Sequence, residues 1–176
     1  MLSAAVAALL LAGSGAADEE GFDPSALPLT DLIACKSDLP SWNGFGLWFH
    51  DNPEAWRRYG VHKIESRNPF LAEYRTDRPI EVFGRTTNRI ALTSSGMLAI
   101  FADGDPAALA RTLGIKPVVA GPTKFMGERI VTDSPFDGGS PAFQGRIQIS
   151  LNVSTVSSHP GAVLAGCSYR LLFNDD

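Results

Sequence analysis

The sequence predicts an α+β protein with a single domain, in which six to seven short strands form a mostly antiparallel sheet. Two or three short helices are expected to pack on one face or end of that sheet. Apolar and polar residues alternate with a period of two in several short segments, and short turns separate those segments. The helical segments do not alternate strictly with the strands, which favours α+β over a parallel α/β arrangement.

The first 17 residues, MLSAAVAALLLAGSGAA, predict a secretory signal peptide, and residues 18–176 then form the mature domain. An apolar run precedes small residues, as in signal peptides, and cleavage is expected after Ala16 or Ala17, although no positive charge precedes the run. The run is shorter than the roughly 20 apolar residues of a membrane-spanning helix, so no membrane span is expected. The predicted location is the bacterial periplasm or the extracellular space.

The chain has two cysteines, Cys35 and Cys167. Cys35 lies in an apolar stripe of a helix predicted over residues 31–37, and Cys167 shares a predicted strand face with Tyr169 and Leu171. Because exported proteins fold where disulfides persist, we predict a disulfide between the two cysteines. It would tie the first helix to the last strand.

The remaining regular elements follow from caps, turns and alternation. A capping residue, a proline and a terminal glycine predict helices over residues 53–59 and 106–113. Glu73 and Glu81 are expected to face water from their strands, and residues 116–122 are expected to form a connection. Strands are predicted over residues 70–75, 80–84, 89–93, 97–102, 125–132, 146–154 and 163–173.

Residues 41–59 contain all three tryptophans of the chain. This aromatic block either binds a sugar or a partner protein, or covers one open end of the sheet. Trp42, Phe45 and Trp48 are the candidate binding residues, because Gly44 and Gly46 interrupt the segment.

Residues 133–145, DSPFDGGSPAFQG, predict a long loop that either binds a partner or is mobile or packed on itself. Phe136 and Phe143 are candidate anchors for a partner, and Asp133 and Asp137 are candidates to meet a basic cleft.

Composition and motifs argue against several functions. The net charge of −4 and the pI near 5.3, without a basic cluster, argue against nucleic-acid binding. The three histidines lack metal-ligand spacing and are expected on loops or the surface, so neither a metal nor another cofactor is expected. The sequence contains no Gly-x-Ser-x-Gly nucleophile motif, and we predict no catalytic residue.

The sequence leaves three functional hypotheses. The first is an exported, non-enzymatic binding protein, such as an inhibitor or immunity-type protein, that holds a partner protein through the aromatic block and the 133–145 loop. The second is a hydrolase of an envelope polymer, with Glu65 and Glu73, or His50 and Asp51, gathered in a cleft. The third is a carrier of a small apolar or carbohydrate ligand.

Overall fold

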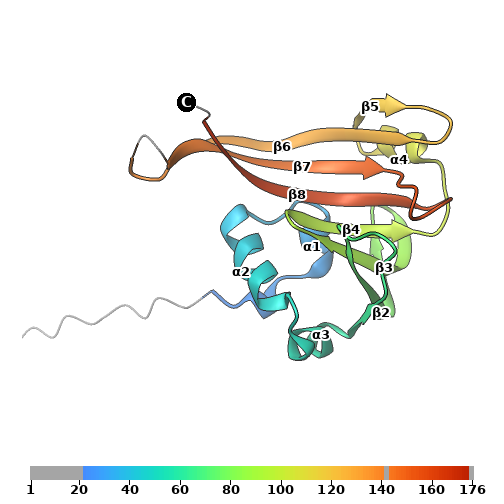
Figure 1. Ribbon diagram of the computed structural model, residues 1–176, viewed down its shortest axis with the longest axis horizontal. Coiled ribbons are helices and arrows are strands. Elements are labelled where there is room, and N and C mark those ends of the chain that lie inside the picture. Colours follow the sequence, from blue (N-terminus) through green and yellow to red (C-terminus); the bar gives the residue numbers. More distant parts are fainter. Residues whose placement is uncertain (1–21, 141–142, 175–176) are drawn as a thin grey trace, which may run out of the picture.

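One antiparallel sheet of eight strands, in the order β1-β2-β3-β4-β8-β7-β6-β5, is the framework of the computed structural model (Figure 1). The structure describes residues 22–140 and 143–174. The α+β class and the antiparallel sheet are confirmed, whereas the predicted number of strands is too low. The strands are β1 (Val61–Ile64), β2 (Ala72–Val82), β3 (Arg85–Thr93), β4 (Gly96–Phe101), β5 (Lys116–Ala120), β6 (Phe125–Asp137), β7 (Gln144–Ser154) and β8 (Val163–Phe173).

The two strands that the sequence prediction missed, β1 and β5, form the two edges of the sheet. Every residue of β5 is exposed, so this strand has no alternation of buried and exposed positions to detect. The segments 70–75 and 80–84 belong to one strand, β2, whose pairing with β3 is irregular between Arg75 and Ile80. The predicted break between them is therefore an irregularity in the pairing of one continuous strand.

Five short helical elements accompany the sheet within the residues that the structure describes. Helices α3 and α4 begin after the predicted caps, Asn52 and Asp105. Helix α2 is not among the predicted helices, because a proline such as Pro40 is also common just after the end of a helix. Asp38 caps α2, and Pro40 occupies its first turn, where a missing backbone N–H costs nothing. The helical elements are a 3-10 turn (Pro24–Ala26), α1 (Leu29–Ile33), α2 (Leu39–Phe49), α3 (Pro53–Tyr59) and α4 (Pro106–Thr112).

The helices cover one face of the sheet and bury the main core there (Figure 1). Ile149, Leu151 and Val153 of β7 alternate toward this core, as the period-two pattern predicted. Figure 1 shows the long strands β6, β7 and β8 side by side, with α1, α2 and α3 below them. No helix in the described part of the chain has the length and apolar character needed to cross a membrane.

The predicted disulfide is present, with a Cys35–Cys167 Sγ–Sγ distance of 2.08 Å. Cys35 follows α1 rather than lying within it, in a left-handed backbone conformation with φ 58°. Cys167 lies in β8, at the centre of the sheet, opposite Met97 of β4 and Leu151 of β7. The bond therefore fastens the end of α1 to the middle of the sheet, and it fits an oxidising compartment.

The second face of the sheet is also covered in part. A smaller apolar cluster forms there from Ala91, Ile100, Ala162 and Leu164. The segment 156–162, which joins β7 to β8, and the segment 65–71, which precedes β2, supply Val156 and Leu71 to this cluster. These two segments shield part of the second face from water.

Candidate functional site

The candidate site is a cavity of about 410 Å³ on the second face of the sheet, which we call the arginine cavity. Its apolar lining includes Ile64 and Ala162. Its charged and titratable lining residues are Glu65, Arg67, Glu73, Arg75, Arg89 and His159. Small-molecule sites commonly have volumes in this range, although most residues that line this cavity are polar or charged.

Glu73 of β2 lines this cavity and is the common acceptor of three hydrogen bonds. Its side chain is 1% exposed, although the sequence predicted that it faces water. Its carboxylate accepts hydrogen bonds from Ser66 Oγ at 2.6 Å, Arg89 Nη2 at 2.5 Å and His159 Nε2 at 3.0 Å. Tyr74 faces the main core, as the alternation in β2 predicts, but the covering segments bury the opposite face at Glu73.

The three hydrogen bonds determine the charge of Glu73. Burial raises the pKa of a carboxyl group, because it disfavours the ionised form. For Glu73 the donors Ser66, Arg89 and His159 outweigh burial, and its pKa is lowered. Glu73 is therefore a carboxylate at neutral pH, and it can only accept hydrogen bonds.

The charge of Glu73 also determines which ring nitrogen of His159 carries the proton. Because the carboxylate is only an acceptor, His159 Nε2 must carry the hydrogen of their 3.0 Å contact. Nδ1 of the neutral ring is then an acceptor, and Ser158 Oγ lies 2.9 Å from it. His159 lies in the loop between β7 and β8, which agrees with the predicted loop or surface position, but its side chain is buried and only 4% exposed.

Arg75 and Arg89 are directly opposite each other in the β2–β3 pair and share one face of the sheet. Like charges in this arrangement repel and destabilise the pair. Glu73 neutralises Arg89, whereas within residues 22–140 and 143–174 no carboxylate oxygen lies within 4.0 Å of Arg67 or Arg75. Three arginines line the cavity against two glutamates, Glu65 and Glu73, so the lining has a net positive charge in a chain whose net charge is −4.

Glu65 and Glu73, which the sequence suggests as a possible acidic pair, both line the arginine cavity. No sequence pattern indicates that Ser66, Arg89, Ser158 and His159 belong to one site. Asn68 joins the two covering segments, since its Nδ2 donates to Ser158 Oγ at 3.2 Å across 90 residues of sequence. The local periodicity of a sequence cannot predict a contact between residues so far apart in the chain.

The aromatic block lies mainly in the core. Trp42 is 4% exposed and Phe45 is completely buried, so neither side chain is available at the surface. The Trp42 ring stacks on Tyr169 of β8 with the ring centroids 5.3 Å apart. Trp48 is half-buried and packs edge-on against Phe45 and Tyr59. This arrangement matches the alternative in which the aromatic block covers the sheet.

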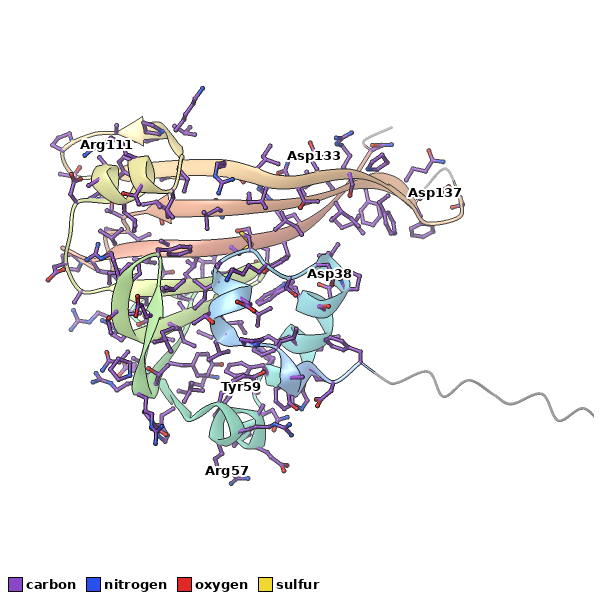
Figure 2. The ribbon with its side chains drawn as sticks, turned by 180° about the vertical axis from the view of Figure 1, so that it is seen from behind. Asp38, Arg57, Tyr59, Arg111, Asp133 and Asp137 are labelled. Atoms are coloured by element: carbon purple, nitrogen blue, oxygen red, sulfur yellow. A yellow bond between two sulfur atoms is a disulfide. The ribbon has the colours of Figure 1, made fainter. Side chains whose placement is uncertain are left out.

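The segment 133–145 is largely a strand hairpin rather than the predicted loop, because β6 continues to Asp137 and β7 begins at Gln144. Figure 2 shows Asp133 and Asp137 toward the outer end of this hairpin. Asp133 accepts a hydrogen bond from Arg146 Nε at 2.7 Å, and Asp137 accepts one from the backbone of Gly139 at 2.9 Å.

The two phenylalanines of that segment differ in exposure. Phe136 is half-buried, whereas Phe143 is 58% exposed. The Phe143 ring packs edge-on against Phe173 of β8, with the centroids 6.4 Å apart. The rings of Phe143 and Phe173 form an apolar surface at the end of the hairpin.

The described residues give no metal-ligand set, since no three His, Cys, Asp or Glu side chains gather there in a way that could hold a metal ion. Comparisons with protein-family models, curated proteins and solved structures found no match for this chain.

Proposed function

We propose that the protein is an exported binding protein that holds a small ligand through a carboxylate or phosphate group in the arginine cavity. The observation that carries this proposal is the unbalanced positive charge of the cavity. Arg67 and Arg75 have no carboxylate partner among the described residues, and Arg75 stands opposite Arg89. An anionic group between the guanidiniums would relieve their repulsion and accept charge-assisted hydrogen bonds.

The surroundings of Arg89 support the same proposal. Its bond to Glu73 holds the guanidinium in place before a ligand arrives, so less side-chain entropy is lost on binding. The apolar residues Ile64, Ala102 and Pro160 offer contacts for the uncharged part of a ligand. Export is supported by the disulfide, which fits an oxidising compartment.

Thermal unfolding in the presence of succinate or inorganic phosphate tests the proposal, with sodium chloride at equal ionic strength as the reference. A ligand at about 100 times its dissociation constant stabilises the folded state by about 2.7 kcal/mol. For a chain of this size, that free energy raises the Tm by roughly 5–10 °C. The two salts separate carboxylate recognition from phosphate recognition.

Arg75→Gln is expected to abolish the rise in Tm. Arg78→Gln is the matched control, because Arg78 is exposed in the same strand but does not line the cavity. The proposal is wrong if neither anion raises the Tm more than chloride does, or if both variants reduce the effect equally.

A partner protein is the second candidate, and the exposed surface of Phe143 and Phe173 favours it. Aromatic side chains contribute strongly to protein interfaces, because they bury a large area with few torsions to fix. Trp42 and Phe45 lie in the core, so this candidate depends on the hairpin end and Trp48. Retention of a partner from a periplasmic extract by the wild type, and its loss in Phe143→Ser, would support this candidate.

A further inference from the structure

Ser158 lies in the turn after β7, between two cavities. It lines both the arginine cavity and a second cavity of about 580 Å³, which is also lined by Asn68, Phe70 and Lys124. Ser158 is half-buried, and its neighbour Ser157 is exposed. A molecule in either cavity would therefore lie beside Ser158.

The hydrogen bonds around Ser158 form a chain with one consistent direction. Asn68 Nδ2 donates to Ser158 Oγ at 3.2 Å, which leaves the hydroxyl proton free for another acceptor. That acceptor is His159 Nδ1 at 2.9 Å. His159 Nε2 in turn donates to the carboxylate of Glu73 at 3.0 Å.

This order of groups has a known chemical use. A serine hydroxyl becomes a nucleophile when an imidazole accepts its proton and a carboxylate orients the imidazole and stabilises its charged form. Here Ser158 is the hydroxyl, His159 is the base, and Glu73 is the positioning residue. The carboxylate is itself held by Ser66 and Arg89, so it is fixed in place.

Hydrogen-bond donors for a developing negative charge lie near Ser158. The side-chain amide of Asn68 donates to Ser158 Oγ at 3.2 Å, and Arg67 lines both of the cavities that Ser158 lines. Donors aimed at the oxyanion of a tetrahedral intermediate commonly supply a large part of the rate enhancement in acyl transfer.

We propose that Ser158 is a nucleophile activated by His159, and that the protein cleaves small carboxylic esters at this position. Ser158 Oγ forms a bond to the acyl carbon while its proton passes to His159 Nδ1. The ester C–O bond then breaks, and His159 returns the proton to the leaving alcohol. Water releases the acyl group by the same steps, with His159 again accepting and returning the proton.

This activity goes beyond ligand binding by the arginines and does not depend on it, because a neutral electrophile reaches the same hydroxyl. The test uses a neutral alkyl fluorophosphonate, which phosphonylates activated serines with loss of fluoride. We expect one added phosphonyl group in the intact mass, and peptide mapping that places it on Ser158. Hydrolysis of p-nitrophenyl acetate should be lost together with labelling.

Ser158→Ala is expected to reduce the labelling rate at least 100-fold, because it removes the hydroxyl that His159 activates and such general-base activation alone contributes roughly 100-fold or more. Ser157→Ala is the matched control and should label as the wild type does, because Ser157 is in the same turn without the contact to His159. Wild-type labelling that is absent, or that falls on other serines, overturns the proposal. So does undiminished labelling of Ser158→Ala.

The role of Glu73 has a separate readout, the pH dependence of labelling. Loss of the carboxylate in Glu73→Gln removes a charge that stabilises protonated His159, so the pH midpoint of labelling should fall. A purely structural role would lower the amount of folded protein and leave the midpoint unchanged. If Glu73→Gln does not fold, the wild type and the two serine variants still decide the proposal.

Discussion

Replacing both cysteines, as Cys35→Ala/Cys167→Ala, should remove a large part of the stability of this protein. The disulfide joins residues 132 positions apart. Loop-closure entropy in the unfolded chain then predicts a loss of about 5 kcal/mol in the free energy of unfolding. Both side chains are buried, with Cys35 8% and Cys167 0% exposed, so alanine also removes packing between the end of α1 and the sheet.

A loss of this size is comparable to the whole stability of many domains, which is about 5–15 kcal/mol. Urea unfolding followed by tryptophan fluorescence measures it, since Trp42 stacks on Tyr169, two residues after Cys167 in β8. The dependence of the free energy on urea should also become steeper, because an unfolded chain without the cross-link exposes more surface.

Reduction of the wild type supplies the control for this experiment. A thiol reductant should lower the stability of the wild type by a similar amount and leave the double alanine variant unchanged. A loss below about 1 kcal/mol in the double variant would refute the argument, because it would mean that the bond constrains neither the unfolded chain nor the packing of α1.

Two further predictions follow from the second face and from the centre of the sheet. The pKa of Glu73 is lower in the folded state than in the unfolded chain. The ionised carboxylate therefore stabilises the folded state at pH values above the unfolded pKa of about 4.3. This stabilisation is lost as the pH falls through the lower pKa of the folded state. Glu73→Gln should therefore be less stable than the wild type by about 2 kcal/mol at pH 7. Urea unfolding midpoints should show that this difference in stability becomes smaller below about pH 4. A difference that stays constant down to about pH 3 would contradict an ionised Glu73 in the folded state. Gly96→Ala should cost about 4 kcal/mol or more in thermal unfolding, because a Cβ atom there would lie 1.8 Å from the Cys167 carbonyl oxygen. Gly84→Ala should cost only about 1 kcal/mol, since its φ of 67° is unfavourable for alanine but nothing lies within 4 Å; equal losses would show that the β4–β8 contact is not the cause.

The sequence was sufficient where local signals determine the structure. Asn52 and Asp105 marked the starts of α3 and α4, because a capping side chain and the following proline act within one turn. The alternation in β7 and β8 showed which residues face the main core. Helix α2 was missed because Pro40 fits the end of one helix as well as the first turn of another, and only the bond from Ser41 N–H to Asp38 decides between them.

The candidate site could not be assembled from the sequence, because its parts come from distant segments. Glu73 and His159 are 86 positions apart, and the 156–162 segment brings them together only when it folds over the second face. The period-two alternation in β2 predicted that Glu73 lies on the face opposite Tyr74. It could not predict that loop segments cover this face and bury Glu73. One hypothesis from the sequence was that Glu65 and Glu73 gather in a cleft, and both residues line the arginine cavity.

The edge strand β5 has a consequence for the behaviour of this protein at high concentration. A sheet edge with free backbone groups can recruit a strand from another molecule and begin aggregation. In β5, Pro117 has no N–H to offer, Lys116 brings a charge, and the pairing with β6 is irregular between Pro117 and Val119. These features protect the edge against intermolecular growth, although Val118 next to Pro117 is 77% exposed.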